Sequence, residues 1–418
     1  MRGGVGLWAR PWRARAVRST RTPLRPRRRD GIVQRRLAVT GVTGALAAAV
    51  LLAGCSSGRS SPDAGSGGVP SRTAAAPSSS ARESAAPAKG SVTVLRTVAQ
   101  GLRSPWGLAE LPDGALLVSS RDEATLTRVD PKTGRTTELG TVPGVAPEGE
   151  GGLLGIALSP HFADDRMIYA YVTSASDNRI VRMRYDQAKP AGRQLGAPDT
   201  VFKGIPKGFI HNGGRIAFGP DGMLYAGTGE SGRRDLSQDK TSLGGKILRL
   251  TPEGEPAPGN PNPGSPVYSW GHRNVQGLAW DDKQRLFASE FGQDTWDELN
   301  AIVPGGNYGW PVVEGTARRS GYRDPVAQWH TDVASPSGIA LVRGSVWMAG
   351  LRGERLWRIP LDGTRAAATP QAFLTEKYGR LRTVARAGDD RLWLVTSATD
   401  GRGEPRKGDD RILELRVS

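Results

Sequence analysis

The stretch Gly214-Arg-Ile-Ala-Phe-Gly-Pro-Asp-Gly-Met-Leu-Tyr225 joins a glycine, a short apolar strand, a Pro-Asp-Gly turn and a second apolar strand. This pattern occurs in six copies, at intervals of 45 to 63 residues, and the other five begin at Gly107, Gly155, Gly277, Gly338 and Thr383. Short alternating strands separated by such turns predict antiparallel hairpins. A repeat of this length built from strands is typical of a propeller. The sequence therefore predicts an all-β fold, a six-bladed β-propeller.

The two ends of the predicted domain both carry strand patterns. In a propeller the first and last strands often pair in one blade, which closes the ring and leaves no free edge. We therefore expect the strand at Ser91–Leu95, or the one after it, to pair with Ile412–Val417.

Most of the excess positive charge lies at the start of the chain. Residues 1–54 hold 12 arginines and one acidic residue, Asp30, and so account for 11 of the net charge of +16. The remaining residues carry a net charge of only about +5. A basic charge confined to a leader is not a nucleic-acid-binding surface, so we predict no nucleic-acid partner.

The leader, residues 1–54, has the form of an export signal. An arginine pair at 35–36 precedes an apolar run over 37–53, which is marginal in length for a membrane span. The run ends in Leu52-Ala-Gly-Cys55, which resembles the bacterial lipobox, and Cys55 is the only cysteine. We expect lipidation of Cys55 and an extracytoplasmic, membrane-anchored protein. A plain signal peptide is the alternative, and the Sec and twin-arginine routes both stay open.

Residues 55–90 consist almost entirely of Ser, Gly, Ala, Pro and Arg. Such a segment cannot bury enough apolar surface to offset its ordering entropy, so a flexible linker is predicted there. Residues 91–418 remain as one propeller domain. With a single cysteine in the chain, neither an internal disulfide nor a thiolate metal site is expected.

Histidine transfers protons near neutral pH, and the chain has four histidines. His211 is the candidate general base because it lies in a glycine-rich loop directly before a predicted strand; a buried structural role is the alternative. His161 is predicted to be structural. His272 is expected to line the same channel as His211, and no role is predicted for His330.

Two further groups of residues suggest ligand binding. The loop Glu290–Asn300 offers Asp294, Asp297 and Glu298 with the carbonyls of Gly292 and Gln293, a hard-oxygen set suited to Ca²⁺, with a solvated loop as the alternative. Arginines from three copies of the repeat lie near strand ends, where they would converge on a polycarboxylate; ordinary surface arginines are the alternative. These arginines are Arg273, Arg352, Arg380 and Arg382.

Several motifs, taken in order, resemble the soluble PQQ-dependent sugar dehydrogenases, the glucose/sorbosone and aldose sugar dehydrogenase family. The resemblance covers nearly all of 91–418. It is carried by Glu148-Gly-Glu-Gly-Gly-Leu-Leu-Gly155, His211-Asn-Gly-Gly-Arg215, Leu243-Gly-Gly-Lys-Ile-Leu-Arg-Leu250, Ser269-Trp-Gly-His-Arg-Asn-Val-Gln-Gly277 and Gly305-Gly-Asn-Tyr-Gly-Trp-Pro311.

The resemblance implies a six-bladed propeller that binds PQQ and Ca²⁺ and oxidises the anomeric carbon of aldose sugars to lactones, passing electrons to an external acceptor. His211 would be the base and Glu230 would orient it. The resemblance further assigns the reduced quinone oxygen to Arg273 with Asn274, the PQQ carboxylates to Arg352, Arg380 and Arg382, the catalytic Ca²⁺ to Gly292 and Gln293, and a structural Ca²⁺ to Glu298 and Tyr308.

The chain departs from the family pattern at a few positions near this site. Glu150 stands where family members usually have Gln, which places a carboxylate beside an anionic cofactor unless it is protonated or paired. Gln293 replaces a common Pro, and Arg352 a common Lys. Arg319 falls where some relatives have an aromatic residue over the cofactor.

Two other functions are compatible with a propeller. A Ca²⁺-dependent hydrolase such as a lactonase would need carboxylates and Asn converging on a central metal, whereas the blade starts here are rich in Arg. A non-catalytic saccharide-binding propeller would keep the repeats without a reason to keep His211, Arg273 and the other arginines together.

Overall fold

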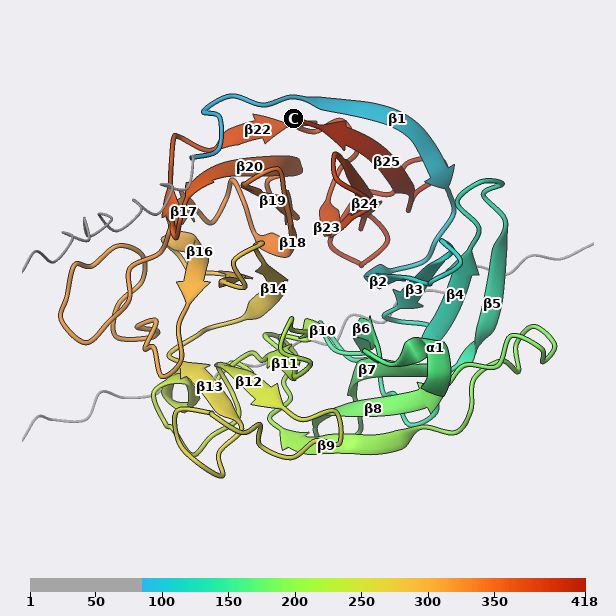
Figure 1. The fold of residues 1–418 in the computed structure, drawn as a ribbon, viewed down its shortest axis with the longest axis horizontal. Coiled ribbons are helices and arrows are strands. Elements are labelled where there is room, and N and C mark those ends of the chain that lie inside the picture. Colours follow the sequence, from blue (N-terminus) through green and yellow to red (C-terminus); the bar gives the residue numbers. More distant parts are fainter. Residues whose placement is uncertain (1–84) are drawn as a thin grey trace, which may run out of the picture. The chain divides into compact units, whose positions relative to one another are not determined.

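The computed structural model describes residues 85–418, which form six antiparallel sheets around a central axis (Figure 1). The predicted leader, Cys55 and most of the predicted linker lie outside the described residues. Helix within the described part is limited to α1 (Phe162–Asp165) and a 3-10 turn (Arg234–Ser237). Among these residues no helix has the length and apolar character needed to cross a membrane. The prediction of an all-β, six-bladed propeller is confirmed.

Each sheet is a meander whose first strand lies nearest the axis. The first sheet holds β2 (Pro105–Glu110), β3 (Leu116–Ser120), β4 (Thr125–Val129) and β5 (Thr136–Thr141). The second holds β6 (Leu153–Leu158), β7 (Met167–Thr173), β8 (Asn178–Arg184) and β9 (Asp199–Ile205). The third holds β10 (Ile216–Phe218), β11 (Leu224–Gly227), β12 (Lys246–Leu250) and β13 (Val267–Trp270).

The next two sheets follow the same plan. The fourth holds β14 (Val275–Trp280), β15 (Leu286–Glu290), β16 (Trp296–Ile302) and β17 (Ala327–His330). The fifth holds β18 (Pro336–Val342), β19 (Ser345–Gly350) and β20 (Arg355–Asp362), with β21 (Arg365–Ala366) and β22 (Gln371–Phe373) both paired to β20.

The sixth sheet closes the ring with strands from both ends of the domain. It holds β23 (Leu381–Arg386), β24 (Arg391–Thr396), β25 (Ile412–Val417) and, outermost, β1 (Val92–Ala99). β1 runs antiparallel to β25 in a register that pairs Val92 with Val417 and Ala99 with Ile412. The predicted pairing of the first and last strands is confirmed.

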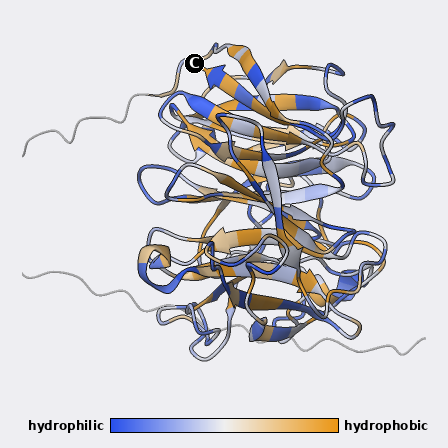
Figure 2. Cartoon of the chain, turned by 90° about the vertical axis from the view of Figure 1, so that its right-hand side faces the viewer, coloured by the Kyte–Doolittle hydropathy of each residue, from blue (hydrophilic) through white to orange (hydrophobic). Residues whose placement is uncertain are grey.

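The hydrophobic core is divided among the interfaces between neighbouring sheets. Each sheet packs against a neighbour on both faces, and apolar residues are concentrated in the strands while many loops are hydrophilic (Figure 2). Six clusters of buried side chains fill the six interfaces; five draw residues from two successive sheets, and the one between the second and third sheets also includes Trp106 of the first. Leu126 of β4 and Leu153 of β6, for example, share one cluster and are completely buried.

The meander order decides which loops meet. The loop before the first strand of a blade and the loop after its second strand lie at the same end of the sheet, because the two strands are antiparallel. Residues preceding β6, β10, β14 and β23 therefore share one end of the channel with residues following β3, β11, β15, β19 and β24. These loops and the start of β23 carry the predicted site residues except Glu298, which lies on β16, and Tyr308, which lies between β16 and β17.

Candidate active site

A pocket of about 360 Å³ lies at this end of the channel. It brings together four of the predicted residues from three blades: Glu150, Arg352, Arg380 and Arg382. Other lining residues were not predicted, namely Trp106, Arg121, Gln276, Phe291, Ser335, Leu351, Asp400 and Arg402. The wall thus holds five arginines and two carboxylates, an excess of positive charge suited to a polyanionic ligand.

Asp400 organises two of these arginines. Its Oδ2 lies 2.9 Å from a guanidinium nitrogen of Arg380 and 3.0 Å from one of Arg382. Burial alone would raise the pKa of Asp400, but Arg382 and Arg380 outweigh that effect and lower the pKa to about 2. The carboxylate therefore stays ionised and holds both guanidinium groups at the pocket wall.

Glu150 is also paired, which removes the charge conflict expected from the sequence. Its Oε1 lies 2.8 Å from a guanidinium nitrogen of Arg402. Its Oε2 accepts the backbone N–H of His211 at 2.8 Å. Arg352, by contrast, is exposed and makes no hydrogen bond or ion pair with any residue that the structure describes, so its charge is available to a ligand.

His211 is held in an uncommon backbone conformation directly before β10. Its φ of +56° lies in the left-handed region that non-glycine residues seldom adopt. Its carbonyl accepts the Ser231 N–H at 3.0 Å, and a Cβ at Gly229 would collide with that carbonyl. A non-glycine conformation fixed by its surroundings is a common feature of functional sites.

The imidazole of His211 forms a short hydrogen bond through Nδ1 to the carboxylate of Glu230, which is almost completely buried. A carboxylate partner favours the tautomer with a proton on Nδ1, which leaves Nε2 free to accept a proton. The structure therefore joins the predicted base to the residue predicted to orient it.

Arg273 and Asn274 lie beside this pair. The Arg273 carbonyl accepts the Glu230 N–H at 2.9 Å, and Asn274 Oδ1 accepts the Gly213 N–H at 2.9 Å. Three buried polar atoms in this neighbourhood have no hydrogen-bond partner: Arg273 Nε, Asn274 Nδ2 and Glu230 Oε2. Buried polar atoms are rarely left unpaired, so these atoms are suited to hydrogen bonds with a polar ligand.

The comparisons with known proteins agree with this geometry. Residues 102–405 match the glucose/sorbosone dehydrogenase family. The chain belongs to this family. An aldose sugar dehydrogenase of Escherichia coli strain K12 is 28% identical over 76% of this chain and 92% of its own length.

Solved structures of related proteins include one in a cofactor-bound form. The PQQ-bound form of the aldose sugar dehydrogenase of Streptomyces coelicolor is 80% identical, with a TM-score of 0.80 over 80% of this chain and 100% of that one. A putative glucose dehydrogenase of Thermus thermophilus is 45% identical, with a TM-score of 0.71 over 78% of this chain and 100% of that one.

His272 was predicted to line the same channel as His211, and this prediction is wrong. His272 is completely buried, with Nδ1 2.7 Å from Glu290 Oε2 and Nε2 2.8 Å from Ser269 Oγ. Its ring stacks on Tyr308 at a centroid distance of 4.6 Å. Burial lowers the pKa of His272 to about 3, so it stays neutral and serves the core of the fourth blade.

The three carboxylates of the acidic loop also do not meet. Asp297 and Glu298 are successive residues of β16 and point to opposite faces of the sheet. Asp297 accepts the backbone N–H groups of Gly292 at 2.9 Å and Ser335 at 2.6 Å, whereas Asp294 is exposed. Within residues 85–418 there is no group of three His, Cys, Asp or Glu side chains placed to hold a metal ion.

The backbone carbonyls of the same loop remain suitable metal ligands. Glu314 Oε1 accepts the Gln293 N–H at 2.6 Å, and the carbonyls of Gly292 and Gln293 accept no hydrogen bond from the residues described. Glu298 accepts the Gly315 N–H at 2.6 Å, and the Tyr308 hydroxyl donates to the Ala301 carbonyl at 2.7 Å. The hydroxyl of Tyr308 is thus engaged, while its carbonyl accepts no hydrogen bond in the described part of the chain.

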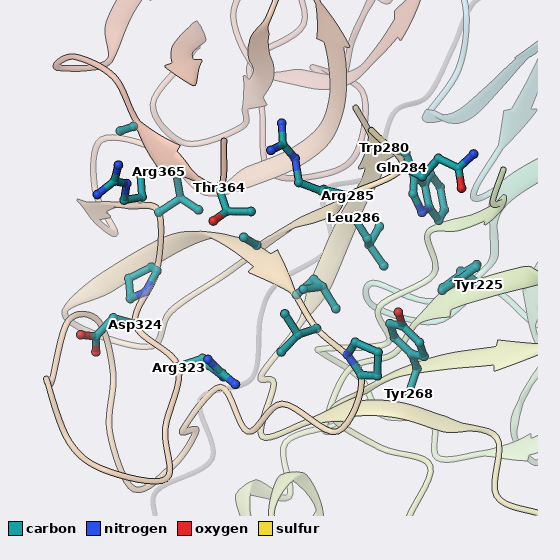
Figure 3. Close-up of a pocket in the computed structure, with 17 residues that line it drawn as sticks. Tyr225, Tyr268, Trp280, Gln284, Arg285, Leu286, Arg323, Asp324, Thr364 and Arg365 are labelled. Carbon is teal, nitrogen blue, oxygen red and sulfur yellow. The ribbon is translucent and has the colours of Figure 1, made fainter. Parts of the chain in front are cut away.

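A larger cavity, of about 650 Å³, lies elsewhere, between Tyr225, Tyr268 and Trp280 on one side and Arg323, Thr364 and Arg365 on the other (Figure 3). It contains none of the predicted site residues. The smaller, arginine-lined pocket is therefore the candidate active site.

Proposed function

We propose that this protein is a PQQ- and Ca²⁺-dependent aldose dehydrogenase that oxidises the anomeric carbon of a sugar to the lactone. The observation that carries the proposal is the arginine-lined pocket beside the buried His211–Glu230 pair. The support from relatedness is 80% identity to a protein whose structure holds PQQ, over the full length of that protein.

The residues of the pocket fit PQQ, which carries three carboxylates. Arg352, Arg380 and Arg382 would bind them. The unpaired Arg273 Nε and Asn274 Nδ2 would donate to the quinone oxygens. Bound PQQ supplies a two-electron acceptor for the hydride of the anomeric C–H bond.

Calcium fits the carbonyl oxygens of Gly292 and Gln293, because Ca²⁺ prefers oxygen ligands and these two accept no hydrogen bond from the residues described. These carbonyls follow Phe291, which lines the pocket, so a cation held there would polarise a cofactor oxygen. A second, structural Ca²⁺ near Glu298 and Tyr308 belongs to the same proposal.

His211 would act as the general base. Its Nε2 accepts the proton of the anomeric hydroxyl while the C–H bond breaks and its electron pair leaves as hydride, so that the C–O bond becomes a carbonyl. Glu230 holds the ring through Nδ1 and stabilises the imidazolium that forms. Arg273 offers positive charge where negative charge develops.

The surroundings of the enzyme are proposed from the sequence alone. A lipid on Cys55 would anchor the domain outside the cytoplasmic membrane, and an external acceptor would take the electrons from the reduced cofactor. Replacement of Cys55 by Ser should release the protein from the membrane fraction. Persistence of the Cys55→Ser variant in that fraction would contradict the anchor.

The test is to strip the purified protein of metal, add PQQ and Ca²⁺ separately and together, and follow dye reduction with a panel of aldoses. Sugar-dependent reduction that requires both additions, with lactone as the product, supports the proposal. Saccharide binding without PQQ binding would favour the non-catalytic alternative instead.

A further inference from the structure

One position of the repeat is a glycine in four blades and a larger residue in the other two. Each innermost strand contains an apolar residue followed by alanine, and the six apolar residues line one cavity at the far end of the channel: Leu108, Ile156, Ile216, Leu278, Ile339 and Val384. The residues directly before them therefore lie at one level of the ring. Four of these are glycines, and the other two are Arg215 in the third blade and Thr383 in the sixth.

The glycines allow neighbouring inner strands to approach closely. A Cβ at Gly107 would lie 2.8 Å from the Leu154 carbonyl, and one at Gly338 would lie 2.9 Å from Thr383 Cα. Side chains at this level are thus excluded from four of the six blades. The space at the axis is left to the side chain of Arg215.

Arg215 reaches across the ring. Its Nε donates to the Gln276 carbonyl at 2.8 Å, and its terminal nitrogen donates to Thr383 Oγ1 at 3.1 Å. Arg215 directly precedes β10, and Thr383 belongs to β23. These two strands lie on opposite sides of the axis (Figure 1). The guanidinium therefore links opposite blades.

This guanidinium is buried without a counter-charge. Arg215 is 9% exposed, both hydrogen-bond acceptors are neutral, and it forms no ion pair with any carboxylate that the structure describes. Burial, with a smaller effect from Arg382, lowers its pKa to about 9, so it remains charged at neutral pH. A buried, unpaired charge is costly and calls for a compensating role.

Arg215 lies directly beneath the candidate active site. Its guanidinium carbon is 4.4 Å from the centre of the Trp106 ring, and the guanidinium of Arg382 is 5.7 Å from the same ring. Trp106, Gln276 and Arg382 line the pocket, whereas Arg215 does not. Arg215 instead lines the cavity at the far end of the channel, and it adjoins the pocket through its contact with the Trp106 indole.

We propose that Arg215 is a positioning residue whose fixed positive charge, held beneath the pocket, raises the reduction potential of PQQ bound there. The inference rests on the proposed function. Transfer of the C–H electron pair to the cofactor as hydride, with the O–H proton taken up by His211, would add one negative charge to the cofactor. A fixed cation behind Trp106 stabilises that gain in a medium of low dielectric constant.

The test compares Arg215→Gln, which removes the charge, with Arg215→Lys, which keeps it. The readouts are the midpoint potential of bound PQQ, from a spectroelectrochemical titration at fixed pH, and the PQQ dissociation constant. Arg215→Gln should weaken binding of reduced PQQ about tenfold relative to oxidised PQQ, which lowers the midpoint by about 30 mV. Arg215→Lys should stay close to the wild type.

Arg358→Gln is the matched control. Arg358 is likewise buried, with its guanidinium carbon 5.9 Å from the centre of a tryptophan ring, and it donates to the neutral acceptors Gln371 Oε1 and the Pro87 carbonyl. It lies, however, on β20, the third strand of its blade. Its replacement should leave the potential unchanged. An equal shift in Arg358→Gln and Arg215→Gln would overturn the inference.

A second variant covers the case in which Arg215→Gln fails to fold, which circular dichroism would reveal. Thr383→Asp places a carboxylate beside the intact guanidinium and should lower the midpoint in the same direction. If the folded variants bind PQQ with the wild-type midpoint potential, the inference about Arg215 is wrong while the proposed function stands. Failure of the wild-type protein to bind PQQ would overturn the proposed function, and the inference with it.

Discussion

Glu150 and Arg402 form an ion pair at 2.8 Å that joins the loop before β6 to the loop after β24. The pair neutralises the one carboxylate that the family resemblance makes unexpected in this pocket. It also connects the pocket to the loop that holds His211, because the other oxygen of Glu150 accepts the backbone N–H of His211.

Replacement of Glu150 by Gln should therefore tighten PQQ binding, by a factor of a few, because Gln keeps an acceptor for the His211 N–H while the freed Arg402 adds one positive charge. Equilibrium titration with PQQ at two ionic strengths checks this, and the gain should shrink at high salt. Weaker binding would show that the Glu150–Arg402 pair favours PQQ binding by positioning the His211 loop, and that this effect outweighs the positive charge it neutralises.

His211→Ala should abolish sugar-dependent turnover, roughly a hundredfold or more, while PQQ still binds, because only the proton acceptor is lost. Glu230→Gln is the companion variant: it keeps a side chain of the same size but removes the charge that stabilises the imidazolium, so kcat should fall more than KM changes. Dye-linked kinetics with a saturating aldose provide the measurement. Unchanged activity in His211→Ala would remove this residue from the mechanism.

Arg380→Gln combined with Arg382→Gln should weaken PQQ binding by about a hundredfold, since charge-assisted hydrogen bonds contribute roughly 1.5–3 kcal/mol each. Arg386→Gln, on the same strand but at the opposite end of the channel, is the control and should bind PQQ normally. Unaltered affinity in the double variant would contradict the carboxylate assignment.

Gln293→Ala should leave the calcium requirement unchanged, because only the backbone carbonyl of this residue is proposed as a ligand. The calcium concentration for half-maximal reactivation of metal-free protein is the quantity to measure. A large increase in that concentration would indicate that the Gln293 side chain takes part.

Asp400 makes the fold sensitive to acid. Its pKa is about 2 in the folded protein against an ordinary value of 3.8, so the ionised form stabilises the fold. That contribution, on the order of 2 kcal/mol, is fully present above pH 3.8 and is lost as the pH falls toward and through 2. Urea unfolding between pH 5 and 2.5 should show this loss in the wild type, and Asp400→Asn should lack that component.

The repeat made the architecture predictable, because the turn chemistry and the apolar alternation recur in every blade. The closure of β1 on β25 followed from the need to leave no free edge. His211 and the arginines at the blade starts could be found because they adjoin the repeated strands.

The remaining residues of the pocket lie in loops whose positions the repeat pattern does not predict. Arg121 and Arg402 follow second strands in loops of unequal length, and their proximity to Glu150 and Asp400 depends on closure of the whole ring. His272 was misplaced for a related reason: one residue before Arg273, its side chain points into the core instead of the channel. Its position in the chain located the loop but not the direction of the side chain.

The sheet that closes the ring mixes the earliest and latest strands of the domain, since β1 lies beside β25. During synthesis β1 emerges first and must wait unpaired until the last residues of β25 have been made. The other five blades consist of strands that follow one another in the chain, whereas the sixth is complete only when β25 has been made. A chain cut short before β25 would therefore lose the two outer strands of the sixth blade at once, because β1 pairs only with β25 in that sheet.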